Sequence, residues 1–339
     1  MPRRNPAKRL TGKQRERIDE MRERRLQNNH EKKCAVWEKF AESEVFPPEE
    51  GRVISHFGFN VEVEDPLGMR FRCAIRETAG QEPVCGDRVQ WSRSANGLPQ
   101  GVIWSIYARK NALQRPSFGG HVQTVAANID LLMITLAADK PNMGLLDRYL
   151  VAAEANAMEA VVVVNKMDKL DGRDSLTQVF ESYVEMGYRI CYVSAHTSQG
   201  MAGLDAVLRD RTSLFAGHSG VGKSSIIGRW IQGEASPIIG ASHEPTGGGR
   251  HTTTVARLYH LSAGGCLIDS PGIREFGLVN VAKESLAGYF RDIAQNARPC
   301  RFSNCSHQHE PECGVKEAVS SGKVSQKRYD SLLRIFHSL

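Results

Sequence analysis

The stretch FAGHSGVGKSS, residues 215–225, constrains the fold of this chain more than any other. It fits the phosphate-loop pattern G-x-x-x-x-G-K-[ST], in which a strand leads through a glycine-rich turn into a helix. Backbone N–H groups of such a turn converge on phosphate oxygens at the helix start. TSLFAG before the turn is strand-like, and SSIIGRWI after it is helix-like. We therefore predict a nucleotide-binding α/β domain. A chance glycine-rich turn is the alternative.

Strand-like and helix-like segments alternate from Asn128 onward. The apolar, strand-like runs are NIDLLMITLAA, EAVVVVN, RICYVSA and TSLFAG, and the helix-like runs between them are LLDRYLVAAEANA, DSLTQVFESYVEMG and LDAVLRD. Continuous apolar strands between helices indicate a parallel sheet that is covered on both faces. Ligands of such sheets bind at the carboxyl ends of the strands, so the residues at those ends are the candidate site.

The residues after two of these strands fit the recognition of guanine. Asn165-Lys166-Met167-Asp168 follows VVVV, and Ser194-Ala195 follows RICYV. The Asp168 carboxylate can accept hydrogen bonds from the N1–H and N2–H₂ groups of guanine, whereas adenine presents no such donor pair. Asn165 would brace the loop, the Lys166 stem would lie over the base, and the amides of Ser194-Ala195 would meet guanine O6.

In the phosphate loop we expect Lys223 to reach the β- and γ-phosphates as a catalytic group and Ser224 to ligate Mg²⁺. We assign nucleotide contacts to the whole turn, namely Gly217, His218, Ser219, Gly220, Val221, Gly222, Lys223, Ser224 and Ser225.

Two downstream segments supply the remaining parts of a GTP site. The polar, glycine-rich run GGGRHTTT at 247–254 is expected to order around a ligand. Thr252 or Thr253 could give a second hydroxyl to Mg²⁺, and we assign Thr253 as a Mg²⁺ ligand with a catalytic part. The strand CLID ends at Asp269, which fits a water-mediated contact with Mg²⁺, and the Gly272 amide fits a γ-phosphate contact.

The residue after the D-x-x-G motif is Ile273, where many GTPases carry a glutamine that orients the attacking water. We therefore expect slow intrinsic hydrolysis. His251 is our candidate for positioning the water, with a structural histidine as the alternative. Arg250 beside it is a candidate for stabilising transition-state charge.

The segment before the sheet has a different character. Residues 51–110 show period-two alternation separated by turn signals, as in DRVQWS and GVIWSIYA. Four or five short strands in this length predict a small closed barrel, OB-like or SH3-like. Such barrels bind nucleic acid in some proteins and are plain structural modules in others.

Basic charge is concentrated at the N-terminus. The chain has a formal net charge of +6, while residues 1–33 hold twelve Lys/Arg and five Asp/Glu. This arm is either a solvated tail or a segment that orders on RNA, where it would release counterions.

Three of the eight cysteines crowd into CRFSNCSHQHEPEC near the C-terminus. Cys300, Cys305 and Cys313 with one histidine suit a closed tetrahedral Zn²⁺ site, and His307 and His309 compete for the fourth position. A cluster of reduced surface cysteines is the alternative. The flanking basic residues suggest an RNA-contacting knob or, equally, ordinary surface charge. The remaining cysteines are scattered singly, which argues for a reducing compartment: Cys34, Cys73, Cys85, Cys191 and Cys266.

All parts of a GTP site are thus present in a rotated order, with the base-reading elements before the phosphate loop. Rotation of a chain is tolerated where its ends can lie close together. The order NKMD, SA, GHSGVGKSS, GGRHTTT and DSPG, between a barrel and a cysteine-rich C-terminus, resembles the circularly permuted RsgA (YjeQ) GTPases from about residue 45 to 339.

The resemblance implies a Mg²⁺-dependent GTPase that acts late in maturation of the 30S ribosomal subunit, is stimulated by that subunit and leaves it after hydrolysis. It favours His307 as the fourth zinc ligand and His251 as the water-positioning group. The implied partner is the 30S subunit with its 16S rRNA. A factor for another RNA such as tRNA, or a GTP-gated RNA-binding scaffold, are the competing functions.

We predict four parts: a basic arm at 1–44, an OB-like barrel at 45–112, a permuted GTPase domain at 113–280 and a helical zinc-binding domain at 281–339. The longest apolar runs are strand-length and shorter than a membrane span, and no secretory signal is evident. We therefore expect a cytoplasmic protein, and nothing in the sequence suggests a stable oligomer.

Overall fold

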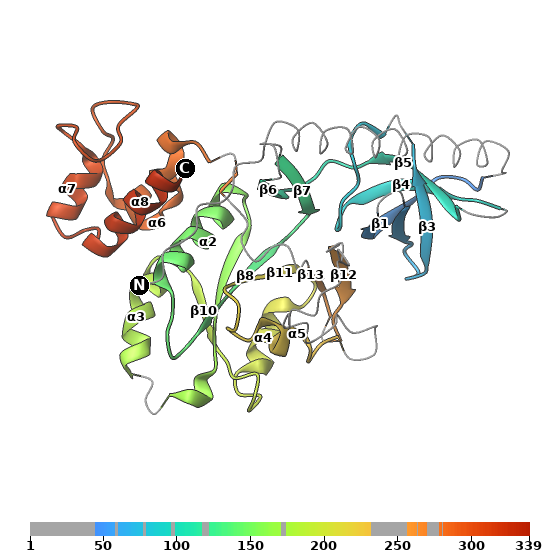
Figure 1. The fold of residues 1–339 in the computed structure, drawn as a ribbon, viewed down its shortest axis with the longest axis horizontal. Coiled ribbons are helices and arrows are strands. Elements are labelled where there is room, and N and C mark those ends of the chain that lie inside the picture. The colour runs from blue at the N-terminus through green and yellow to red at the C-terminus, as the bar shows by residue number, and fades with distance from the viewer. Residues whose placement is uncertain are drawn as a thin grey trace, which may run out of the picture. The chain divides into compact units, whose positions relative to one another are not determined.

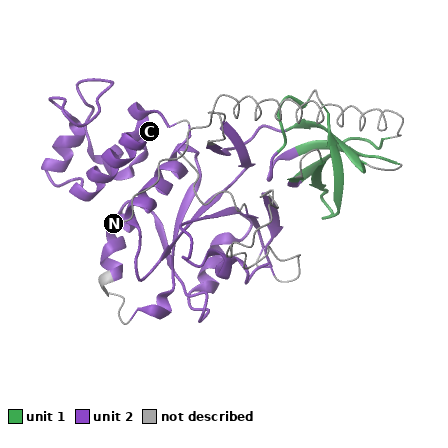
Figure 2. Cartoon of the chain, viewed as in Figure 1, with its two compact units in different colours: residues 1–52, 56–83, 89–106 green, residues 53–55, 84–88, 107–339 purple. Residues whose placement is uncertain are grey.

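A computed structural model describes residues 45–57, 60–76, 79–95, 99–116, 122–170, 174–231, 256–262, 264–269, 278–279 and 281–339. The basic arm and the run 247–254 lie outside these residues. The chain divides into two compact units (Figure 2): the first takes in residues up to 52, 56–83 and 89–106, and the second takes in 53–55, 84–88 and 107–339. The finer four-part division stays a prediction.

The first unit is built on a closed five-stranded barrel. Its strands are β1 (Glu49–Phe57), β2 (Asn60–Glu64), β3 (Arg70–Ile75), β4 (Arg88–Arg93) and β5 (Gly101–Ile106). They follow the order β1-β2-β3-β5-β4, and β4 pairs back with β1. β3 and β5 run parallel, while β2–β3 and β4–β5 are antiparallel. This closed arrangement confirms the OB-like alternative.

The barrel encloses its own apolar interior. Val61, Val63, Val89 and Trp91 are fully buried, as the alternation of apolar and polar residues predicts. Gly51 makes room for the indole, because a Cβ atom at this position would lie 2.5 Å from Trp91 Nε1. The position of the Trp91 indole therefore requires a glycine at residue 51.

The second unit contains a mostly parallel sheet. Its strands are β8 (Leu131–Ala137), β9 (Glu159–Asn165), β10 (Arg189–Tyr192), β11 (Thr212–Ala216), β12 (Arg257–His260) and β13 (Cys266–Asp269). Their order is β10-β9-β8-β11-β13-β12, in which only β12 is antiparallel to its neighbour β13. A separate two-stranded ribbon, β6 (Ala112–Pro116) with β7 (Val122–Ala127), precedes β8.

Helices cover both faces of this sheet (Figure 1). α2 (Met143–Ala155) and α3 (Asp174–Glu185) pack with Leu132 and Ile134 of β8 in one apolar cluster. α4 (Met201–Leu208) and α5 (Lys223–Ile227) pack with Leu131 and Met133 in a second cluster. Successive residues of β8 thus enter different cores, which explains why its sequence is continuously apolar.

The C-terminal segment is helical, as predicted. It contains the 3₁₀ helix η4 (Lys283–Tyr289) followed by α6 (Arg291–Asn296), α7 (Gly314–Ser320) and α8 (Gln326–Ser338). Phe290, Leu332 and Ile335 share one apolar cluster with Leu146 of α2. The C-terminal helical segment therefore shares an apolar core with α2. Among the described residues, none of the helices combines the length and apolar character needed to cross a bilayer.

Candidate functional site

The predicted base-reading loop, residues 165–168, and the predicted phosphate loop, residues 217–225, leave the sheet at one edge. β9 ends at Asn165, β10 at Tyr192, β11 at Ala216 and β13 at Asp269. These four strands run parallel with β8 among them, so their carboxyl ends lie on the same side of the sheet (Figure 1). This edge is where ligands of open α/β sheets bind.

The base-reading loop is tightly organised. Lys166 has φ of 68° and leads into the 3₁₀ turn Met167–Lys169. The Ser194 hydroxyl donates to Asp168 Oδ1 over 2.5 Å and accepts the Thr197 N–H over 3.0 Å. The bond from Ser194 lowers the pKa of the Asp168 carboxyl below its usual range. A carboxylate that stays ionised on an exposed turn can accept hydrogen bonds from a ligand that presents a cation or several N–H groups.

Asn165 joins the two halves of the site. The residue is 2% exposed. Its Nδ2 donates to the Val221 carbonyl over 2.9 Å, and its Oδ1 accepts the Ala195 N–H over 3.1 Å. Lys166 Nζ adds a bond of 2.6 Å to the Gly220 carbonyl. The base-reading loop therefore holds the phosphate loop directly. The Ala195 amide is engaged by Asn165 here, and its predicted contact with guanine O6 stays a prediction.

Glycines shape the phosphate loop where no side chain fits. At Gly217 (φ 144°) a Cβ atom would lie 2.3 Å from the Thr135 carbonyl, and at Gly222 (φ 92°) it would lie 2.3 Å from Asn165 Nδ2. Lys223 Nζ donates to the carbonyls of Gly217 and His218 over 2.7 and 2.8 Å. The turn is thus wrapped around the lysine ammonium. The contribution of Thr135 gave no signal in the sequence.

The predicted Mg²⁺ and catalytic residues are only partly described. Ser224 lies exposed in the first turn of α5, and Asp269 ends β13, the strand next to β11. Both therefore lie at the same sheet edge as the phosphate loop. Thr253, His251 and Gly272 are outside the described residues, as are Thr252, Arg250 and Ile273.

Three cysteines and one histidine of the C-terminal segment converge. One ligand atom from each of Cys300, Cys305, His307 and Cys313 lies within 4.8 Å of all the others. His307 Nδ1 is 3.6 Å from Cys300 Sγ and 3.5 Å from Cys313 Sγ, and these two sulfurs are 3.8 Å apart. A tetrahedral zinc site would separate two thiolates by about 3.8 Å and a thiolate from an imidazole nitrogen by about 3.6 Å. The cluster can therefore hold a metal ion of this size.

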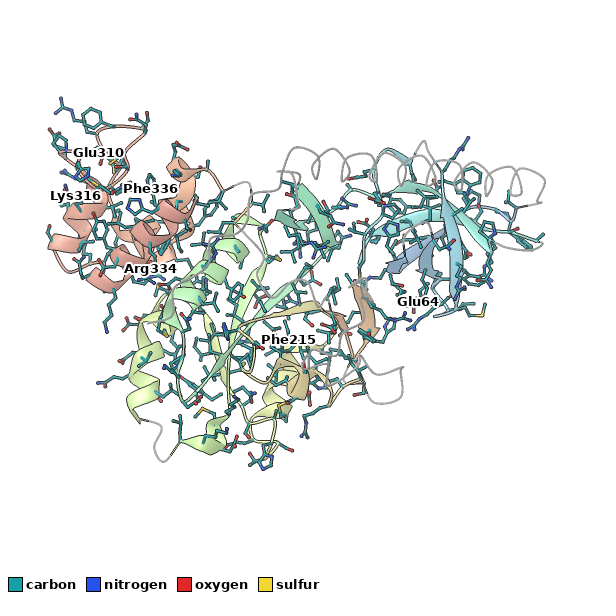
Figure 3. All side chains as sticks on the ribbon, in the orientation of Figure 1. Glu64, Phe215, Glu310, Lys316, Arg334 and Phe336 are labelled. Carbon is teal, nitrogen blue, oxygen red and sulfur yellow. The ribbon has the colours of Figure 1, made fainter. Side chains whose placement is uncertain are left out.

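The loop that carries the cluster, residues 300–313, is called the metal loop below. His307, the predicted histidine ligand, is buried, whereas the rival His309 is exposed. The Glu310 carboxylate, labelled in Figure 3, accepts the N–H groups of Ser306, Gln308 and His309 over 2.8, 3.1 and 3.2 Å. The bonds from Ser306 and Gln308 lower the pKa of Glu310, and all three bonds fix the backbone of the metal loop. This role could not be predicted from the sequence, because an isolated acidic residue in a polar loop carries no pattern.

The basic residues around the metal loop are not isolated charges. Arg298 pairs with Glu317 over 2.6 Å, and Arg301 pairs with Glu312 over 2.5 Å. Lys316, also labelled in Figure 3, donates to the Glu310 carbonyl over 3.4 Å. Exposed pairs of this kind stabilise a fold by only about 0–1 kcal/mol, so an anionic partner could displace the carboxylates at little cost.

The sheet, the loop order and the shared edge define a circularly permuted P-loop GTPase domain preceded by an OB-like barrel. Comparison with known proteins places it more narrowly. The sequence profile of the RsgA GTPase family matches residues 106–279. The chain belongs to this family.

Curated relatives and solved structures support this family membership. The small ribosomal subunit biogenesis GTPase RsgA of Dickeya dadantii is 37% identical over 98% of this chain and 95% of its own length. The protein of the same name from Sodalis glossinidius is 38% identical over 94% of each. The structure of YjeQ from Thermotoga maritima has a TM-score of 0.69 at 33% identity and covers 86% of this chain and 99% of its own. YloQ, a circularly permuted GTPase, has a TM-score of 0.67 at 27% identity, covering 86% and 95%.

Proposed function

We propose that this protein hydrolyses GTP as a late assembly and checkpoint factor of the 30S ribosomal subunit. In this proposal the subunit stimulates the reaction, and the protein leaves after hydrolysis. The observation that carries the nucleotide site is the bond between Asn165 and Val221, which places the base-reading loop against the phosphate loop. The curated relatives, named as GTPases of small-subunit biogenesis, support the assignment of the partner.

Separate groups of residues would bind the guanine base and the phosphates of GTP. Asp168 accepts the N1–H and N2–H₂ groups of guanine, and the Ser194 hydroxyl keeps it ionised and oriented. The remaining proposed contacts to the base come from Asn165, Lys166, Met167 and Ala195. The amides of residues 217–225 and the Lys223 ammonium bind the phosphates, because this turn and the start of α5 present positive charge.

Hydrolysis needs charge neutralisation and a positioned water. Ser224, Thr253 and Asp269 would hold Mg²⁺ directly or through water, and the ion would neutralise charge on the β- and γ-phosphate oxygens. Many GTPases orient the water with a glutamine at the position that Ile273 occupies here. His251 would take over this role. We infer that the subunit brings His251 into place, which makes turnover depend on the partner.

The metal loop would hold one structural Zn²⁺ ion through Cys300, Cys305, His307 and Cys313. The separations among Cys300, Cys313 and His307 match those of a closed tetrahedral site, and the Cys305 sulfur lies within 4.8 Å of the other three ligand atoms. Such a site leaves no position for substrate. Zinc would therefore supply folding energy to a segment that has few buried residues of its own.

The remaining assignments rest on the proposed partner. The barrel, the metal loop and the basic arm would contact 16S rRNA, and the exposed ion pairs at Arg298 and Arg301 would reopen toward phosphates. We further propose a cytoplasmic monomer with the four parts 1–44, 45–112, 113–280 and 281–339.

The test is GTP turnover by the full chain alone and with isolated small subunits, large subunits or tRNA. We expect stimulation by small subunits only, and ATP should not displace GTP. Stimulation by tRNA alone would support a factor for another RNA. Binding to small subunits that leaves turnover unchanged would support a GTP-gated scaffold.

A further inference from the structure

A buried cluster of charges joins the C-terminal segment to the GTPase helices. Arg328 of α8 is 5% exposed. Its guanidinium forms an ion pair with Asp147 of α2, and it donates from Nε and Nη2 to the two carboxylate oxygens of Asp292 of α6, each over 3.0 Å. The Tyr183 hydroxyl of α3 donates to Asp147 over 2.8 Å. Four helices therefore meet at one guanidinium.

Aromatic rings complete the surroundings of this guanidinium. Its carbon lies 4.6 Å from the ring centre of Phe290 and 5.4 Å from that of Tyr183. Asp147 and Asp292 are also buried, at 4% and 9% exposure. Removing a charge like this from water is costly unless its partners are well placed. Without the arginine, two carboxylates would face each other in a low-dielectric interior, so the contact depends strongly on this residue.

The next residue of α8 reaches the metal loop. The Tyr329 hydroxyl donates to the carbonyl of His307 over 2.5 Å, and His307 supplies the cluster's nitrogen. Adjacent residues of one helix thus fasten the metal loop on one side and the helices α2 and α3 on the other. These two helices follow β8 and the base-reading loop in the chain.

We propose that Arg328 is a positioning residue. It fixes the metal loop relative to the sheet edge that carries the base-reading and phosphate loops, so that one large partner can contact the metal loop and this edge at once. The inference rests on the proposed function for the identity of that partner, the small ribosomal subunit. The physical reason is preorganisation: a partner that binds two rigidly connected sites does not have to order the connection between them. A loosened C-terminal segment would weaken the partner's hold without touching the nucleotide.

The test compares full-length variants. Arg328→Met leaves the two carboxylates unpaired and should release α8. We expect small-subunit affinity and small-subunit-stimulated turnover to fall by about tenfold or more, while GDP affinity and bound zinc per chain match the parent. Adding Asp147→Asn and Asp292→Asn to Arg328→Met removes the repulsion and should restore much of the affinity. That rescue would show that the position of the segment matters and not the charge of the arginine.

Lys327→Met is the matched control, because Lys327 is exposed on the same helix and carries the same charge. A loss as large as that of Arg328→Met would mean that only attraction to RNA had been removed and would overturn the proposal. Unchanged small-subunit affinity in Arg328→Met would overturn it as well.

Amide exchange separates this inference from the proposed function. In Arg328→Met we expect faster exchange in residues 326–338 and unchanged exchange in 131–137, whether or not any ribosomal particle binds. If the parent protein fails to respond to small subunits, the proposed function fails while this readout still reports on the contact. Unchanged exchange in 326–338 would show that Arg328 does not hold the segment.

Discussion

Asn165 Nδ2 donates to the carbonyl oxygen of Val221 over 2.9 Å, across 56 positions of the chain. The bond connects the residue that opens the base-reading loop to the middle of the phosphate loop. Two loops that are proposed to contact opposite ends of one nucleotide are thus in direct contact with each other. The geometry of either loop depends on the other, and this dependence can be tested with single substitutions.

The first prediction uses two glycines of the phosphate loop. Gly222→Ala places a Cβ atom against Asn165 Nδ2, whereas at Gly220, which also has a positive φ of 82°, the added atom meets nothing within 4 Å. Backbone strain of about 1–2 kcal/mol is common to both variants, so their difference reports the collision. We expect GDP affinity, measured by calorimetry, to fall much further in Gly222→Ala. Equal losses would show that the contact with Asn165 does not support binding.

The second prediction concerns acid pH. Because the Ser194 hydroxyl lowers the pKa of Asp168, the carboxylate and its contribution to base binding persist as the pH falls through the usual range of an aspartate pKa. They are lost only as the pH falls through the lowered value. Ser194→Ala should raise this pKa, so GDP affinity should fall at a higher pH than in the parent. Thr197→Val, which keeps the backbone N–H donor to Ser194, is the control. Coincident pH profiles of Ser194→Ala and the parent would contradict the assignment.

The third prediction is the effect of removing metal. A chelator should raise amide exchange throughout residues 300–313, because the buried residues of the metal loop are its predicted ligands Cys305, His307 and Cys313, and should leave exchange in 131–137 unchanged. Cys305→Ser should abolish metal retention. Cys191→Ser, which changes a cysteine outside the cluster, should keep one metal ion per chain by elemental analysis. Unchanged exchange in the metal loop after chelation would exclude a structural role for the ion.

The fourth prediction addresses catalysis. His251→Ala should abolish the stimulation of turnover by small subunits and leave GTP binding intact, because the imidazole is proposed to position water and not to hold the nucleotide. Single-turnover hydrolysis and a binding titration separate the two effects. Arg250→Ala, the neighbouring change, measures the contribution of positive charge in the same segment. Equal stimulated rates in His251→Ala and the parent would remove the histidine from the mechanism.

Much of the sheet could be predicted from the sequence, because buried parallel strands such as VVVV are apolar on both faces and stand out from the helices between them. The shared edge of the loops followed from the parallel arrangement alone. The ribbon β6–β7 was missed, because ALQRP and VQTVAA lack a clear alternation of apolar and polar residues. The antiparallel strand β12 is only four residues long and gave no signal.

Contacts between distant residues could not be predicted. A polar pattern predicts that Asn165 braces a loop, but its acceptor is a backbone carbonyl, which every residue has. Arg328 lies in an amphipathic helix, where an arginine is ordinarily placed on the solvent side. Its burial depends on carboxylates from two other helices, and only the folded chain brings these together.

The division of the chain into two units has a practical consequence for dissection of the protein. Ile54, which lies within β1, and Cys85, which precedes β4, belong to the apolar cluster of the second unit. Within that unit, Asp87 accepts two hydrogen bonds of 2.7 Å from Arg109. A fragment that starts at residue 107 would lose the apolar side chains of Ile54 and Cys85 and the Asp87 carboxylate that pairs with Arg109. Limited proteolysis or truncation at that point should therefore yield a weakened GTPase fragment, not an autonomous one.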